Sequence, residues 1–211
     1  LAHELGHAMH SYLSSATQDY ANHDYRLLVA EVASTCNEVL LTKYLLKTET
    51  DTKRRAYILN HFLEGFRTTV FRQTLFAEFE HKAHALEAAG TPINAECLNE
   101  VYAELVKQYY PDAEFRDTLK YEWSYIPHFY RAYYVYQYAT GYAAAIALSR
   151  RILREGEPAV KDYLGFLSGG CSADPITLLR GAGVDMASPK PIEDATKLFD
   201  EMISEMEKIL N

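Results

Sequence analysis

The sequence predicts an all-α fold. Three observations support this prediction: apolar residues recur at helical spacing in almost every segment, helix-breaking residues separate those segments, and no alternating run is long enough to predict a sheet. At 211 residues the chain is long enough to bury a sizeable core, as one large domain or as one domain with an appendage. The expected architecture is therefore a multi-helix domain.

In the first half of the chain, helices are expected at residues 1–17, 26–47, 51–88 and 95–109. A polar stretch, 17–24, separates the first two. Gly90 ends the long amphipathic third helix, and Asn94 is expected to cap the fourth because its side chain can accept a hydrogen bond from a free backbone N–H.

In the second half, Pro111 begins a less regular stretch that leads to an expected helix at 130–154. Gly156 and Pro158 separate that helix from a short one that ends at "LSGG". A further short helix is expected in "DPITLLRGAGVDM", followed by a closing amphipathic helix at 193–210.

Charge and composition exclude several classes of function. The formal net charge of -8 is unsuited to a nucleic-acid or anionic-membrane surface, which would require a basic face, so neither partner is expected. No apolar run approaches the roughly 20 residues of a membrane span. The three cysteines are widely spaced and odd in number, which favours reduced thiols and a cytoplasmic location.

A metal-binding motif lies at the start of the chain, in "LAHELGHAMH". His3, Glu4 and His7 form the H-E-x-x-H pattern of metallohydrolases. On a helix, His3 and His7 lie about 40° apart and Glu4 lies on the same side. Two imidazoles on one face can hold one Zn²⁺ while Glu4 reaches a water molecule at the metal.

A catalytic zinc site needs a third protein ligand, and the second expected helix offers one in "AEVASTCNE". Glu31 is the favoured ligand and Glu38, which returns to within about 20° of it on a helix, is the alternative. Ser34 or Glu38 is available to orient a histidine. His10 lies two turns from His3, so a packing or substrate-side role is favoured over metal binding.

A second polar cluster lies in "YIPHFYRAYYVYQYATGYAAA", where His128 precedes six tyrosines within thirteen residues. Most of these rings are expected in a core. A tyrosine hydroxyl or a protonated histidine can also stabilise the oxyanion that forms during peptide hydrolysis. The residues alone do not select one ring.

Four segments in order, "HELGHAMH", "AEVASTCNE", "IPHFYRAYYVYQYATGYAAA" and "FLSGGCSADPITLLRGAGVDM", resemble the oligoendopeptidase F branch of the thimet oligopeptidase-like zinc peptidases. The resemblance covers nearly the whole chain. It implies a helical zincin subdomain, residues 1–211, that forms the C-terminal catalytic part of a larger oligopeptidase whose N-terminal part is absent. It also implies cleavage of short peptides inside a channel between the two parts.

The resemblance further implies a role for each site residue. His3, His7 and Glu31 become the ligands of one zinc ion, and Glu4 becomes the general base. His128, with Tyr136 and Tyr138, becomes a donor to the transition state, and Tyr133 is the alternative when the two patterns are aligned without a gap. If the chain is cut just before the first ligand, His3 lies in a frayed first turn, and weaker metal binding is expected.

Two other functions remain open at the level of the sequence. A helical zinc carboxypeptidase can share the same motif and glutamate ligand, and it would need a cationic pocket, for which Arg131 is the only obvious residue near the tyrosines. The histidines can also be incidental, because a motif with three fixed positions arises by chance. The chain would then be a non-catalytic helical fragment or binding module.

Overall fold

The structure is a computed structural model that describes residues 1–210, and within that range it is helical with no β-strand, so the all-α prediction is confirmed. The chain divides into two compact units. The first unit contains residues 1–66 and 140–210, and the second contains Arg67–Ala139. Each unit has its own apolar core and is described separately.

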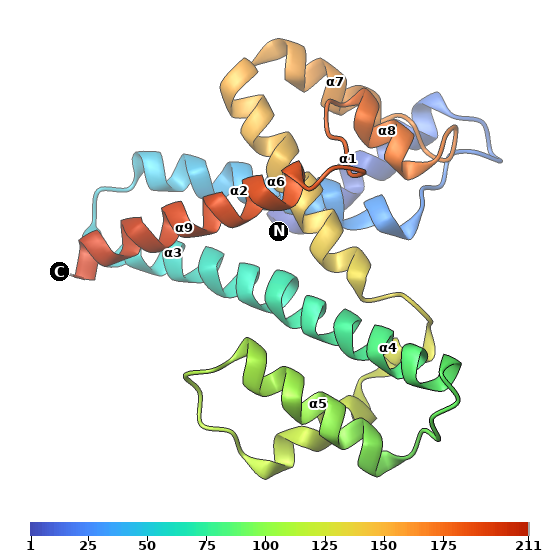
Figure 1. Cartoon of the computed structure of the whole chain (residues 1–211). Coiled ribbons are helices and arrows are strands. Elements are labelled where there is room, and N and C mark those ends of the chain that lie inside the picture. The colour runs from blue at the N-terminus through green and yellow to red at the C-terminus, as the bar shows by residue number, and fades with distance from the viewer. Residues whose placement is uncertain (211) are drawn as a thin grey trace. The chain divides into compact units, whose positions relative to one another are not determined.

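The first unit contains the two helices that carry the zinc motif and the candidate glutamate. They are α1 (Ala2–Thr17) and α2 (Leu27–Thr48), and they pack against each other. The other helices of this unit are α3 (Thr52–Phe66), most of α6 (Tyr136–Glu155), α7 (Glu157–Leu167), α8 (Pro175–Gly181) and α9 (Lys190–Leu210). The helix α9 lies along α3 (Figure 1).

Helix α2 is central to the first unit. Its residues 32–36 are buried one after another, which shows that several faces of the helix are covered. Its apolar side chains share a core with residues of α6, α7 and α8, among them Ala144, Phe166 and Leu179. The candidate glutamate ligand of α2 therefore lies on a packed helix rather than on a loop.

The second unit is built on α4 (Arg72–Ala88) and α5 (Ala95–Tyr109), which pack together. Two 3₁₀ segments follow, η2 (Asp117–Tyr125) and η3 (Pro127–Tyr130). Aromatic side chains fill the core between these elements, including Phe79 and the fully buried Tyr102. Asn94 caps α5 as expected, because its side chain accepts a hydrogen bond from the backbone N–H of Cys97.

Two predicted helices differ from the structure. The expected helix 51–88 is interrupted by a π-helical segment, η1 (Arg67–Phe71). Three successive β-branched residues, 68–70, lie in that segment, and such side chains crowd the preceding helical turn. The boundary between the two units falls at the same place, after Phe66.

The expected helix 130–154 begins six residues late, at Tyr136. Tyr133 has a left-handed backbone, with φ of 56°, which a right-handed helix does not allow. Its backbone N–H donates to the buried carboxylate of Glu80 at 2.6 Å instead of to a helical carbonyl. The hydrogen bond to Glu80, 53 positions away in the sequence, therefore overrides the local preference of this segment for a helix.

Two further observations concern the whole described chain. Cys36, Cys97 and Cys171 are free thiols, as the cysteine pattern predicts. Among residues 1–210, no helix combines the length and the apolar character that crossing a membrane requires.

Candidate metal centre

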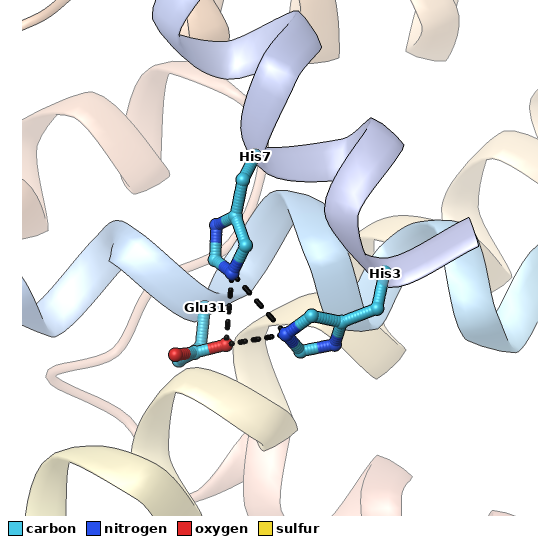
Figure 2. A group of neighbouring side chains, drawn as sticks. All are labelled: His3, His7 and Glu31. Atoms are coloured by element: carbon cyan, nitrogen blue, oxygen red, sulfur yellow. Dashed lines mark hydrogen bonds and ion pairs between the residues drawn. The ribbon is translucent and has the colours of Figure 1, made fainter. Parts of the chain in front are cut away.

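The two histidines of the motif lie one helical turn apart on α1, and their side chains converge beside Glu31 (Figure 2). Their Nε2 atoms are 3.2 Å apart, and the two rings meet edge to face. The side chains of His3 and His7 are 35% and 29% exposed. A group bound between the two Nε2 atoms would therefore remain open to solvent on one side.

Glu31 on α2 faces this histidine pair. Its Oε2 atom lies 3.4 Å from His3 Nε2 and 3.5 Å from His7 Nε2, so the three atoms form a nearly equilateral triangle (Figure 2). Within residues 1–210, this is the single group of three or more His, Cys, Asp or Glu side chains arranged to hold a metal ion.

The close approach of α1 to α2 depends on Gly6, the residue before His7. A methyl group at this position would lie 2.5 Å from Ser34 Cα and 2.6 Å from the carbonyl oxygen of Ala33, far inside van der Waals contact. The two backbones therefore meet where a side chain would separate them. Asn37 of α2 adds a hydrogen bond to the carbonyl oxygen of Ala2 in the first turn of α1.

The triangle fits a tetrahedral zinc ion. Zinc lies about 2.0–2.2 Å from histidine nitrogen and carboxylate oxygen, and a tetrahedron with such bonds has ligand atoms about 3.3–3.5 Å apart. The observed separations, 3.2 to 3.5 Å, match this edge length. Two neutral nitrogen donors and one carboxylate are also a ligand set that catalytic zinc accepts, with a fourth position left for water.

Two residues next to the triangle contact its members, Glu38 as expected from the sequence and Ser34 differently. Glu38 Oε1 lies 3.4 Å from His3 Nδ1, the ring nitrogen that faces away from the other ligands. Ser34, fully buried, lies against Glu31 rather than a histidine, with its Oγ 3.0 Å from Glu31 Oε2. Glu38 is therefore placed to fix a histidine ring, and Ser34 to fix the carboxylate.

Glu4 lies on α1 between the two histidines in sequence, and its side chain is exposed. It makes no hydrogen bond or ion pair with the described residues, whereas Glu31 makes three close contacts with polar side chains. Its carboxylate is thus open to solvent.

His10 is not part of the triangle. It is 1% exposed, its ring stacks on Tyr25 at 3.7 Å between centroids, and Phe166 lies 5.7 Å away. Burial, with a smaller contribution from His7, lowers the pKa of His10 to about 4, so the ring is neutral at pH 7. The structure therefore gives His10 a packing position.

The loop between α1 and α2, which belongs to the polar stretch 17–24, carries three residues whose side chains make local hydrogen bonds. Asp19 accepts a hydrogen bond from the backbone N–H of Asn22, and Asp24 accepts one from the backbone N–H of Tyr25. His23 Nδ1 lies 2.8 Å from the carbonyl oxygen of Tyr20. All three contacts are local and shape the loop.

His128 and the tyrosines from Tyr130 to Tyr138 lie in the second unit. The His128 ring stacks on Tyr134 at 5.2 Å and meets Tyr138 edge to face at 5.7 Å. The Tyr138 hydroxyl is 3.3 Å from that of Tyr134. The structure thus brings His128, Tyr138 and Tyr134 into one group, and Tyr134 is a residue that the sequence did not single out.

The two other tyrosines considered from the sequence are placed differently. Tyr136 is the first residue of α6 and is 45% exposed. The Tyr133 ring stacks on His84 of α4 at 5.1 Å. A further tyrosine, Tyr142, lies in the first unit, buried against Phe66, and burial together with the nearby charge of Glu38 raises its pKa.

Comparison with known proteins identifies the family. The model of peptidase family M3 matches residues 1–198. The chain belongs to peptidase family M3. The resemblance seen in the four sequence segments is therefore confirmed. Over all its residues, this M3 chain is 56% identical to oligopeptidase PepF of Bacillus subtilis.

Other M3 relatives agree. The chain is 46% identical, over its full length, to the group B oligopeptidase PepB of Streptococcus agalactiae. The crystal structure of oligoendopeptidase-F from Enterococcus faecium superposes with a TM-score of 0.89 at 45% identity and covers 99% of this chain. The chain spans about a third of the length of these relatives: 32% of PepF, 35% of PepB and 38% of the crystallised protein.

Proposed function

We propose that this M3 chain is the zinc-binding, catalytic part of a metalloendopeptidase that hydrolyses short peptides. The observation that supports the proposal most strongly is the triangle of His3, His7 and Glu31, whose edges match tetrahedral zinc ligation and whose side chains leave one side open. The names of the relatives, oligopeptidase and oligoendopeptidase, agree with this reaction.

The three ligands and their neighbours prepare the site. His3, His7 and Glu31 would hold one zinc ion per chain, which supplies Lewis-acid polarisation of the scissile carbonyl and lowers the pKa of water. Glu38 would keep the His3 ring oriented with Nε2 as the donor, and Ser34 would hold the Glu31 carboxylate through its hydroxyl.

Glu4 would act as the general base. Its exposed carboxylate, free of hydrogen bonds, can take a proton from the attacking water and give it to the leaving amine. His128, Tyr136 and Tyr138 would donate hydrogen bonds to the oxyanion of the tetrahedral intermediate. For these three residues the proposal relies on the family resemblance, supported by the contact between His128 and Tyr138 in the second unit.

The wider setting is also proposed. Residues 1–211 would be the C-terminal catalytic part of a longer cytoplasmic protein, consistent with relatives about three times as long. The remaining part of that protein would be its structural partner and would complete a channel for peptide substrates.

A matched pair of variants tests the proposal in the complete protein. Glu4→Gln should retain zinc and lower the turnover of a short internally quenched peptide by at least about a hundredfold, because the general base is lost. Glu207→Gln, which removes an exposed carboxylate from α9, is the control and should leave turnover unchanged. Full activity of Glu4→Gln would remove Glu4 from the mechanism.

One observation favours a second candidate, a carboxypeptidase. The Arg131 guanidinium lies over the Tyr134 ring at 5.8 Å, close to His128, where it could receive a peptide carboxylate. A peptide with an amidated C-terminus separates the candidates. Internal cleavage of that peptide supports the endopeptidase, whereas cleavage only when the terminal carboxylate is free supports the carboxypeptidase.

A further inference from the structure

The second unit contains a pocket that none of the proposed catalytic steps uses. It has a volume of about 540 Å³ and lies between α4, α5 and the 3₁₀ segments. Its walls are largely apolar, and the Phe79 ring contacts those of Trp123 and Phe129. Pockets of this size, apolar with a few polar groups, are typical of small-ligand sites.

One buried acidic group faces this apolar pocket. Glu80 is 6% exposed, yet it lines the pocket, and its Oε1 atom accepts the hydrogen bond from the backbone N–H of Tyr133. Among the described residues, no donor lies within hydrogen-bond distance of its other oxygen, Oε2, and the carboxylate forms no ion pair. This oxygen is not among the fully buried polar atoms that lack a partner, so it reaches solvent at the pocket wall. Buried carboxylates are normally paired, so this one lacks a cationic partner.

The remaining charges of the pocket have the same sign. Glu87 also lines it, and no lysine or arginine does. His84 is the one basic side chain of the lining, and its ring is stacked on Tyr133. The pocket therefore offers a negative potential inside apolar walls.

The aromatic walls suit a cation as well. The Trp123 indole is fixed by a hydrogen bond from its Nε1 atom to Asn99 Oδ1 at 2.8 Å. In the described part of the chain, no lysine or arginine lies over the rings of Trp123 or Phe129, although four such pairs occur elsewhere. Open aromatic faces attract ammonium and guanidinium groups through the ring quadrupole.

We propose that this pocket binds an organic cation, an ammonium or guanidinium group carried on an apolar stem. The cation would pair with the free Oε2 of Glu80, and the stem would lie between Trp123, Phe129 and the apolar side chain of Ile93. A lysine or arginine side chain of a peptide and a free alkyl cation share this chemistry. The proposal does not depend on the proposed peptidase reaction.

The single tryptophan of the chain lines the pocket, so its fluorescence and its indole proton signal report on binding directly. The full chain is titrated with Nα-acetylarginine amide and with Nα-acetylcitrulline amide, a neutral analogue of the same shape. The arginine compound should saturate with a Kd of about 1 mM or tighter, and the citrulline compound should bind at least about tenfold more weakly.

A variant pair assigns the effect to Glu80. Glu80→Gln keeps the side-chain size and the acceptor for the Tyr133 N–H but removes the negative charge. The affinity for the arginine compound should therefore fall by about tenfold or more. Glu100→Gln, an exposed position of α5 outside the pocket, should bind as the unaltered chain does. Circular dichroism checks that each variant is folded.

Three results would overturn the proposal: no saturable signal up to about 10 mM ligand, equal binding of the arginine and citrulline compounds, or unchanged affinity in Glu80→Gln. The first two need no variant, so a failure of Glu80→Gln to fold leaves the test intact. Butylguanidinium separates the two sources of the cation. If butylguanidinium binds as tightly as Nα-acetylarginine amide, the pocket recognises the cation and its stem alone. If butylguanidinium binds more weakly, the pocket also recognises the peptide-like groups of the arginine compound.

Discussion

Gly6 of α1 and Ser34 of α2 are in backbone contact, since a Cβ atom on Gly6 would lie only 2.5 Å from Ser34 Cα. His7 follows Gly6 directly, and Ser34 holds Glu31 through its hydroxyl. The two helices therefore meet at the position where their ligands must converge.

We expect Gly6→Ala to push α1 away from α2. The free energy of unfolding should fall by about 1–3 kcal/mol, the usual cost of overpacking, and zinc affinity should fall with it because Glu31 moves away from the histidines. Urea unfolding and a zinc titration measure the two effects.

Gly165→Ala in α7 is the matched control, because a methyl group there meets nothing within 4 Å. This variant should be as stable as the unaltered chain or more stable, since alanine favours a helix over glycine by about 0.5–1 kcal/mol. Equal stability of Gly6→Ala and Gly165→Ala would contradict the close-contact account.

Local patterns in the sequence were sufficient for most of the fold. Helical spacing and end signals located α1, α2 and α5 to within two residues, and the capping role of Asn94 followed from its side chain alone. The start of α6 was missed, because it depends on Glu80, a residue distant in sequence that captures the backbone N–H of Tyr133.

Part of the geometry of the candidate site could be predicted for a similar reason. His3 and His7 share one helix, so their spacing fixes their relation. Glu31 and Glu38 lie on one face of the second helix, so spacing left both open, and the contact of Glu31 with both histidines depends on how the two helices pack. The partners of Ser34 and the contact between His128 and Tyr134 depend on packing between side chains, which spacing does not encode.

His10 predicts a pH dependence of stability. Its pKa is about 4 in the folded chain and about 6.5 when unfolded, so the unfolded state binds the proton more readily. The contribution of neutral His10 to the free energy of unfolding is fully present above pH 6.5. It is lost as the pH falls from 6.5 towards 4, which lowers the free energy of unfolding by up to about 3 kcal/mol.

Urea unfolding at pH 7 and pH 4.5, with a chelator present, measures this loss. His10→Phe keeps a ring against Tyr25 and should reduce the difference between the two pH values, whereas exposed His81→Gln should leave it unchanged. An identical pH dependence in His10→Phe and the unaltered chain would show that His10 is not responsible.

Glu38→Gln tests the orientation of His3. Because Glu38 faces His3 Nδ1, its loss should weaken zinc binding by about 10–100-fold while the three ligands remain. Competition with a chromogenic chelator gives the affinity, and Glu207→Gln is the control for removal of a surface charge. An affinity within about twofold of the unaltered chain would exclude an orienting role for Glu38.

The central claim is that His3, His7 and Glu31 form a zinc site. The most direct test is the zinc content per chain after dialysis, together with the melting temperature with and without Zn²⁺. We expect about one zinc per chain, a higher melting temperature when zinc is present, and loss of both in His3→Ala. Absence of zinc and of any thermal shift in the unaltered chain, or full retention of zinc in His3→Ala, would contradict the assignment.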